Sequence, residues 1–137
     1  MTVAHSSHFI AQYQRTNASE TIYRFSELDS TNTYLRNRCP ELNHGDVILA
    51  DWQSAGRGAY GNTWHTPPGA AFLWSVLWQL PPVSAARMEP FDLTRAAAYG
   101  VVSALQEVYP ALDFSIKWPN DILIGPRKLA GILIETL

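Results

Sequence analysis

The chain contains a single cysteine, Cys39, among its 137 residues, so no internal disulfide can form and a reducing compartment is expected. No apolar run approaches the roughly 18 residues that a membrane span requires. Residues 1–8 lack the basic and apolar regions of a secretory signal peptide. We therefore expect a soluble cytoplasmic protein with no membrane partner, and we interpret Cys39 as a structural thiol rather than a nucleophile.

Charged residues are also scarce, and neither sign of charge predominates. Charged residues make up 16% of the chain and the formal net charge is −2, which argues against a general nucleic-acid binder with a basic stripe. His44 and His65 stand alone in predicted loops, so a metal site built from histidine is not expected. Hydrophobic residues make up 47% of the chain, enough for one packed globular domain.

The spacing of apolar residues predicts alternating strands and helices. The strands are expected at residues 22–25, 47–52, 71–78, 114–118, 121–124 and 128–135. A first helix contains Tyr34 and Leu35, takes Asp29 or Ser30 as its N-cap and is stopped by Pro40. A second helix is expected over residues 90–109, with an apolar side that packs on the sheet. The polar N-terminus is expected to be frayed.

The order of these elements predicts the fold class. Residues 71–78 are apolar on both faces, which is typical of a central strand covered on both sides. The last two strands are expected to form a hairpin around Gly125 and Pro126. The order strand–helix–strand–strand–helix–strand–strand–strand predicts an α+β domain with a mixed β-sheet and helices packed on it.

A glycine-rich segment, Gly56-Arg57-Gly58-Ala59-Tyr60-Gly61, separates two of the predicted strands. Its G-x-G-x-x-G spacing occurs in dinucleotide-binding and kinase loops and is weak evidence by itself. A dinucleotide site needs a helix that opens at the third glycine, and the prolines at positions 67 and 68 do not fit the first turns of one. We interpret the segment as a mobile flap between strands whose backbone N–H groups can approach a phosphate.

Four polar clusters interrupt the apolar framework at element ends, where ligands gather in open sheets. They are residues 29–32, Gln53 with the glycine loop, residues 117–121, and residues 127–128. Each cluster alone has a structural interpretation, as a helix cap, an Asx-turn or a solvated hairpin residue. Their coincidence in one short chain favours a ligand site.

The four clusters resemble the signature segments of the catalytic domain of biotin protein ligases. The residues that carry the resemblance are Asp29-Ser30-Thr31-Asn32, Gln53-Ser54-Ala55-Gly56-Arg57-Gly58 with Gly61 and Trp64, Lys117-Trp118-Pro119-Asn120-Asp121, and Lys128-Leu129-Ala130-Gly131-Ile132-Leu133. They follow the family's order over about residues 22–135. The resemblance implies a fold like that of class II aminoacyl-tRNA synthetases and biotin synthetases. It also implies one catalytic domain over residues 1–137, without the family's C-terminal part.

The resemblance implies a two-step reaction. Biotin's carboxylate attacks the α-phosphate of ATP to give biotinyl-5′-adenylate and pyrophosphate, and a lysine of a biotin carboxyl carrier domain then takes the biotinyl group. The carrier would belong to a carboxylase of the acetyl-CoA carboxylase type. ATP with Mg²⁺ is the implied co-substrate and biotin the substrate, with no tightly bound prosthetic group. Family members often dimerise, which suggests a homodimer, although no face of the sequence is apolar enough to predict one.

The resemblance also assigns roles to residues. Catalysis falls to Arg57, Lys117, Asp121 and Lys128. Biotin is bound by Ser30, Thr31, Asn32, Gln53, Arg57, Gly58, Ala59 and Lys128, with Ser30, Thr31 and Gln53 on its ureido ring. The nucleotide is bound by Gly56, Arg57, Gly61, Trp64, Lys117, Asn120 and Lys128. Mg²⁺ is expected to bind through the ATP phosphates, with Asp121 as a candidate ligand. Fixed cations are the main catalytic resource because charge concentrates on the α-phosphoryl oxygens.

The chain departs from the family in three places. Ala59, Tyr60 and Asn62 stand where members often carry arginine or lysine, which predicts weaker retention of the adenylate. Only 28 residues precede Asp29, too few for the DNA-binding domain of some members, so no DNA partner is expected. The family's later strands, helix and small β-barrel have no counterpart after the strand-like residues 133–137, which leaves the activity of the chain by itself open.

Two alternatives to a biotin protein ligase share much of its fold but differ in function. A lipoate ligase or octanoyl transferase acylates a similar carrier lysine, but its adenylating members favour a different glycine motif with paired arginines and lack Lys-Trp-Pro-Asn-Asp. A non-catalytic biotin-binding fragment is the second alternative, and the presence of Arg57 and Lys128 argues against it.

Overall fold

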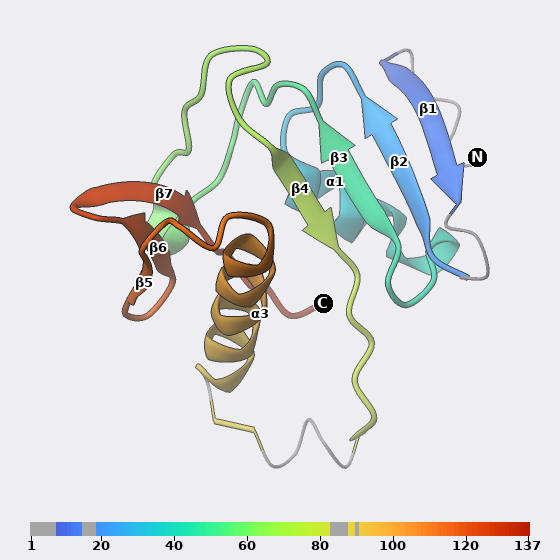
Figure 1. The fold of residues 1–137 in the computed structure, drawn as a ribbon. Helices are drawn as coiled ribbons and strands as arrows, with labels where there is room; N and C mark the ends of the chain where they lie inside the picture. The colour runs from blue at the N-terminus through green and yellow to red at the C-terminus, as the bar shows by residue number, and fades with distance from the viewer. Residues whose placement is uncertain (1–7, 15–18, 83–87, 90) are drawn as a thin grey trace. The chain divides into compact units, whose positions relative to one another are not determined.

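The chain forms two compact units, residues 1–79 and residues 80–137, which are described separately. The computed structural model describes residues 8–14, 19–82, 88–89 and 91–137 (Figure 1). The expectation of one catalytic domain over the whole chain stays a prediction. In these described ranges, every helix is too short or too polar to cross a membrane.

The first unit is built on a four-stranded mixed sheet. Its strands are β1 (Phe9–Gln14), β2 (Thr21–Phe25), β3 (Val47–Ala50) and β4 (Leu73–Val76), in the spatial order β1-β2-β3-β4. β1 is antiparallel to β2, β2 is parallel to β3, and β3 is antiparallel to β4. The parallel pair needs a crossover, which the helix between β2 and β3 provides. The predicted mixed sheet is therefore confirmed in this unit.

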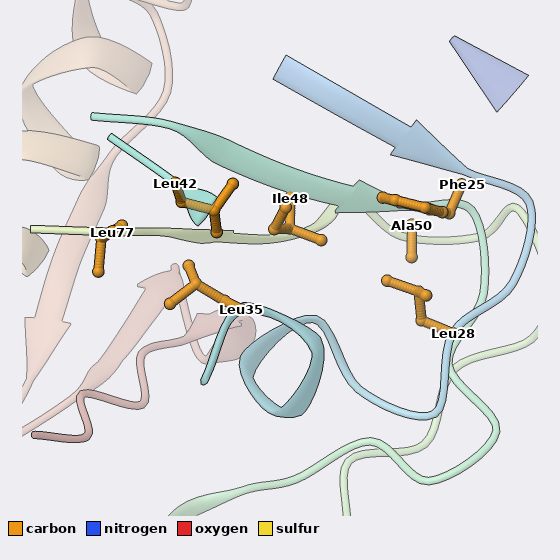
Figure 2. Packing of buried hydrophobic residues seen from close by; sticks show 7 residues of the cluster. All are labelled: Phe25, Leu28, Leu35, Leu42, Ile48, Ala50 and Leu77. Atoms are coloured by element: carbon orange, nitrogen blue, oxygen red, sulfur yellow. The ribbon is translucent and has the colours of Figure 1, made fainter. Parts of the chain in front are cut away.

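Helix α1 (Thr31–Arg38) covers one face of this sheet (Figure 1). Ser30 is its N-cap and accepts a hydrogen bond from the Thr33 N–H at 3.4 Å, as one of the two predicted caps requires. Leu35 of α1 faces the side chains of the sheet (Figure 2). The buried cluster consists of Phe25, Leu28, Leu35, Leu42, Ile48, Ala50 and Leu77. Removal of this apolar area from water is what holds α1 and the sheet together.

The second unit contains α3 (Asp92–Val108) and a three-stranded antiparallel sheet. Its strands are β5 (Phe114–Lys117), β6 (Asp121–Ile124) and β7 (Arg127–Gly131), in the order β5-β6-β7. The helix lies against β5 and β6, as its predicted amphipathic pattern requires. The β6–β7 hairpin turns at Gly125, whose φ of +54° is readily adopted by glycine. The predicted hairpin is confirmed.

Several sequence-based expectations need correction. No strand was expected before residue 22, but residues 9–14 form β1, which hydrogen-bonds to β2. The expectation of a frayed N-terminus concerns residues 1–8, of which residues 1–7 lie outside the described ranges. Residues 71–78 were expected to form a central strand, but β4 is the last strand in the order of its sheet and only alternate residues are buried. Their apolar character predicts buried positions for Trp74 and Val76, but 44% of the Trp74 surface and 40% of the Val76 surface are exposed.

Element ends also differ from the expected ones. β3 ends at Ala50 rather than at position 52, and β7 ends at Gly131 rather than at position 135. Residues 132–137 are therefore not a strand, although their composition is strand-like. α1 ends at Arg38, and Pro40 lies in a 3₁₀ turn, Cys39–Glu41, that follows it. Pro40 therefore ends the α-helix but still fits into the short 3₁₀ turn that follows it.

Candidate functional site

The first polar cluster surrounds the N-terminus of α1. Ser30 and Thr31 are 3% and 4% exposed, which is uncommon for hydroxyl residues. The Ser30 N–H donates to Asp29 Oδ1 at 2.6 Å, and the Ser30 hydroxyl caps the helix. Asp29 and Ser30 therefore have a local structural role, and the predicted role of Ser30 toward biotin stays a prediction.

Thr31 connects this cluster to Gln53, which lies beyond β3. The Thr31 N–H donates to Gln53 Oε1 at 2.7 Å, and the Thr31 hydroxyl donates to the same oxygen at 3.0 Å. Because a backbone N–H can only donate, the Gln53 amide is oriented with its oxygen toward Thr31. Residues from two predicted clusters, 22 positions apart, thus meet in one hydrogen-bonded group.

Ser75, in the middle of β4, completes this group and was not singled out from the sequence. Its Oγ lies 2.8 Å from Thr31 Oγ1 and donates to Asn32 Oδ1. Ser75 is 8% exposed and shares the inner side of β4 with Leu73. The signal that could have identified it is a lone hydroxyl in an otherwise apolar strand, because a buried hydroxyl needs a partner. We call Thr31, Asn32, Gln53 and Ser75 the oxygen cluster.

The glycine loop lies between β3 and β4 and contains no α-helix, as predicted. It closes as a small hairpin, in which the Trp64 N–H donates to the Gly56 carbonyl at 2.8 Å and the Gly58 N–H to the Asn62 carbonyl at 2.7 Å. A 3₁₀ turn, Ala59–Gly61, forms its tip. Tyr60 has a φ of +57°, unusual for a residue with a side chain.

The packing of the loop explains Gly56. A Cβ at this position would overlap the Trp64 carbonyl oxygen and would lie 3.0 Å from Gln53 Nε2. Glycine is therefore required for the loop to close on itself beside the Gln53 amide. Arg57 is exposed on the same hairpin, and Trp64 is half-buried. The structure thus presents a cationic side chain on a loop anchored next to the oxygen cluster.

The remaining predicted site residues lie in the second unit, in the β5–β6–β7 sheet. The Lys128 Nζ is 2.7 Å from Asp121 Oδ1, an ion pair across the β6–β7 hairpin with side-chain exposures of 44% and 17%. Lys117 ends β5 directly opposite Asp121 on β6. The strand register therefore brings Lys117 to the same end of the sheet as the Lys128–Asp121 ion pair.

Asn120 has a structural role in the same sheet. Its Nδ2 donates to the Ile132 carbonyl at 3.1 Å, and the Ile132 N–H donates back to the Asn120 carbonyl at 2.8 Å. This exchange fixes the chain directly after β7. The Trp118–Pro119 peptide bond before it is cis, and the Trp118 ring packs edge-on against Phe91 at a centroid distance of 4.7 Å.

The donor set does not fit a dedicated metal site. Within the described ranges, no group of three or more His, Cys, Asp or Glu side chains is arranged to hold a metal ion. Asp121, the candidate Mg²⁺ ligand, already pairs with Lys128. One carboxylate of this kind suits an ion that arrives on the phosphates of a nucleotide rather than a resident metal.

Comparisons with known proteins agree with the resemblance noted in the sequence. The biotin/lipoate A/B protein ligase family matches residues 25–137. The bifunctional ligase/repressor BirA of Escherichia coli is 41% identical over 111 residues, which cover 79% of this chain and 32% of the relative. The biotin–[acetyl-CoA-carboxylase] ligase of Paracoccus denitrificans is 38% identical over 109 residues, covering 79% of this chain and 44% of the relative.

Solved structures show the same likeness. The biotin acetyl coenzyme A carboxylase synthetase of Helicobacter pylori, with bound biotinylated ATP, matches with a TM-score of 0.73 and 28% identity, over 86% of this chain and 55% of that one. The biotin protein ligase of Aquifex aeolicus, in complex with biotin and ATP, matches with a TM-score of 0.72 and 30% identity, over 84% and 46%. The predicted fold class is confirmed.

The chain spans about a third of the length of the Escherichia coli relative and less than half of the Paracoccus one. The family match, in contrast, covers most of this chain, from β2 to the last residue. The chain belongs to the biotin/lipoate A/B protein ligase family.

Proposed function

We propose that this chain is part of an ATP-dependent biotin protein ligase, which activates biotin as biotinyl-5′-adenylate and transfers it to a lysine of a biotin carboxyl carrier domain. The observation that carries the proposal is the oxygen cluster, in which Thr31, Asn32 and Gln53 meet although two separate motifs supply them. A buried polar group of this kind suits a ligand with matched hydrogen-bonding groups.

The activation step is governed by charge. Biotin's carboxylate and the triphosphate of ATP repel each other, and negative charge concentrates on the α-phosphoryl oxygens as the new P–O bond forms. Arg57, Lys117 and Lys128 supply fixed positive charge for these groups. The pyrophosphate leaves with the electrons of the broken P–O bond, and no proton needs to be removed from the attacking carboxylate at neutral pH.

The loop and the hairpin have complementary roles in this proposal. Arg57 contacts both the carboxylate and the phosphate, while Gly58 and Ala59 let the backbone approach them. The proposed contacts with the nucleotide come from Gly56, Gly61, Trp64 and Asn120. Asp121 would help to hold a Mg²⁺ ion on the ATP phosphates, and the ion would offset their negative charge. Excluding water from the adenylate protects a mixed anhydride from hydrolysis.

The second step needs a carrier. Relatives named as ligases of acetyl-CoA carboxylase make a carrier domain of that type the proposed partner. The neutral amine of the carrier lysine attacks the acyl carbon of the adenylate. An amide C–N bond forms as the acyl C–O bond to AMP breaks, AMP leaves with the electrons of that bond, and the amine loses one proton. We keep the cytoplasm as the proposed location. A homodimer also stays a proposal.

Lipoate is the second candidate substrate, because the matching family includes lipoate ligases. Biotin and lipoate both carry a carboxylate on a short alkyl chain, but only biotin carries a ureido ring with N–H donors. A ligand present at 100 times its Kd raises the free energy of unfolding by about 2.7 kcal/mol. Thermal melting with each acid therefore distinguishes the two candidates.

The direct test is transfer. The chain is incubated with biotin, Mg²⁺-ATP and a purified biotin carrier domain, and the carrier is examined on an avidin blot. Labelling that depends on ATP and is lost in Lys128→Ala supports the proposal. Arg127→Ala is a matched control, since Arg127 is also cationic and exposed and precedes Lys128 in β7. Loss of labelling in both variants, or in neither, would contradict the assigned role of Lys128.

A further inference from the structure

Arg24 of β2 and Asp51, directly after β3, form an ion pair that lies outside the four polar clusters of the sequence. The Arg24 Nε donates to Asp51 Oδ1 and the Nη2 donates to Oδ2, each at 3.1 Å. The guanidinium and the carboxylate therefore meet at two points, which fixes their relative orientation as a single contact does not. The guanidinium also hydrogen-bonds to the side chain of Tyr13 on β1. Arg24 thus links β1 and β2 to the chain directly after β3.

The ion pair lies on the face of the sheet away from the oxygen cluster. Phe25, the neighbour of Arg24 in β2, is fully buried in the apolar cluster beneath α1. Neighbouring residues of a strand point to opposite faces, so Arg24 lies on the face that α1 leaves uncovered. Its effect on a ligand near Thr31 must therefore pass through the backbone of Asp51.

The backbone of Asp51 joins the two ends of the glycine loop. Its N–H donates to the Phe25 carbonyl at 3.0 Å and extends the pairing of β3 with β2 by one residue. Its carbonyl accepts the Gly69 N–H at 2.9 Å, from the chain that returns toward β4. Residues 52–68 thus form a loop that is closed at Asp51, and this loop carries every site residue predicted between β3 and β4.

The first residues of this loop are also bonded to the segment before α1. The Ser54 N–H donates to the Leu28 carbonyl at 3.0 Å, and the Ala55 N–H donates to the Asp29 carbonyl at 2.9 Å. The hairpin that follows is bonded internally, so these contacts and the bonds of Asp51 decide where it lies. Asp51 is the point at which a side-chain contact can influence both ends of the loop.

We propose that Arg24 and Asp51 are positioning residues, which hold the glycine loop, and with it Arg57, in place from the opposite face of the sheet. With side-chain exposures of 40% and 36%, the ion pair contributes little to global stability. It is, however, directly beside the backbone bonds that close the loop. Without the pair, Asp51 is held by its backbone bonds alone, and the loop ends open more often.

The consequence for catalysis rests on the proposed function. Arg57 stabilises the developing charge only where it lies at the α-phosphoryl oxygens, and a displacement of about 1 Å lowers a rate by about 10². The Gln53 amide is held separately by Thr31, so binding of biotin depends less on the loop ends. We therefore expect the pair to affect kcat of biotin-dependent pyrophosphate exchange more than KM for biotin.

The first measurement is amide hydrogen exchange by NMR in the 137-residue chain, which reports on the loop without any ligand. In Arg24→Ala, the Gly69 N–H should exchange about threefold to fivefold faster, because the loop ends open more often. The Tyr34 N–H, which donates to the Ser30 carbonyl in the first turn of α1, should keep its rate. The melting temperature should change little.

Further variants separate positioning from a general loss of structure. Asp51→Ala should match Arg24→Ala, and the double variant should be no worse than either, since the two residues act through one contact. Arg24→Lys keeps the charge but not the two-point contact, so its Gly69 rate should be intermediate. Arg38→Ala is the control, because it removes the similarly exposed Arg38–Glu41 ion pair from the same unit and should leave the Gly69 rate unchanged.

Acceleration confined to the loop ends supports the positioning role. Equal acceleration of the amides throughout the first unit, or an unchanged Gly69 rate in Arg24→Ala, would overturn it.

The second measurement is kcat and KM of biotin-dependent pyrophosphate exchange. In Arg24→Ala, kcat should fall about tenfold while KM for biotin stays within about threefold. An unchanged kcat would overturn the consequence for catalysis. Pyrophosphate exchange that lipoate supports as well as biotin would contradict the proposed function and leave the amide result standing. In a chain without biotin-dependent exchange, the amide rates alone decide the role of the pair.

Discussion

The ammonium of Lys128 and the carboxylate of Asp121 form an ion pair across the β6–β7 hairpin, with 2.7 Å between Nζ and Oδ1. The pair is partly exposed, so its contribution to stability is small. Pairs of this kind contribute about 0–1 kcal/mol. The ion pair matters more for the proposed reaction, because the Asp121 carboxylate holds the Lys128 ammonium in one position on the sheet.

Lys128→Ala should therefore separate activity from stability. We expect adenylate formation to fall by about 10²–10³, the usual effect of removing one preorganised donor from a developing charge. The melting temperature should change little. Pyrophosphate exchange measures the first quantity and circular dichroism the second. A large loss of stability in Lys128→Ala, compared with Arg127→Ala, would show that the pair is mainly structural.

Gly56 and Gly58 offer a comparison within one loop. A Cβ at Gly56 would overlap the Trp64 carbonyl oxygen, whereas the nearest atom to a Cβ at Gly58 is the Asn62 carbonyl oxygen at 3.3 Å. We expect Gly56→Ala to lower the free energy of unfolding by about 1–3 kcal/mol, as overpacking does, and Gly58→Ala to cost less. Urea unfolding of both variants checks the order. Equal midpoints would contradict the described loop closure.

Asp46 should matter for stability although it lies in none of the motifs. It is 0% exposed, and its two oxygens accept the Thr21 and Asn43 N–H groups, each at 2.8 Å. Asp46→Asn would turn one acceptor into a donor that faces a donor, at a cost of about 1–3 kcal/mol. Asp113→Asn, at an exposed position, is the control. Chemical denaturation should show a lower free energy of unfolding for Asp46→Asn than for Asp113→Asn. Similar unfolding curves for the two variants would refute the stabilising role of Asp46.

Asp92 should make the stability of α3 depend on pH. The Glu89 N–H and, next, the Arg95 guanidinium hold the pKa of Asp92 below its usual value of 3.8. Because the folded pKa is the lower one, the charged form stabilises the fold above pH 3.8, and this contribution is lost as the pH falls through the folded pKa. The stability difference between the unmodified chain and Asp92→Asn, measured by thermal melting, should therefore shrink in acid. A difference that is constant with pH would exclude this role.

Much of the fold could be predicted because local patterns determine it. The α1 cap at Ser30, the β6–β7 hairpin at Gly125 and the amphipathic helix α3 each follow from residues within a few positions of one another. The motifs also identified Thr31 and Gln53 as candidate site residues. Their hydrogen bond, however, joins positions 22 apart and is visible only in the folded chain.

The rest depends on contacts that periodicity does not encode. The pattern of β4 predicts burial on both faces, but an apolar side chain such as Trp74 can be exposed at the edge of a sheet. β1 was missed because most of its residues are exposed and its pairing with β2, rather than its own composition, defines it. Ser75 was missed for the same reason, since its importance comes from Thr31 and Asn32.

Biotin-dependent exchange of pyrophosphate into ATP by the purified 137-residue chain is the most direct test of the proposed activation of biotin. We expect exchange that requires biotin and Mg²⁺, that is not supported by lipoate, and that falls by about 10²–10³ in Lys128→Ala. Exchange that lipoate supports as well as biotin, or that survives Lys128→Ala unchanged, would contradict the proposed function.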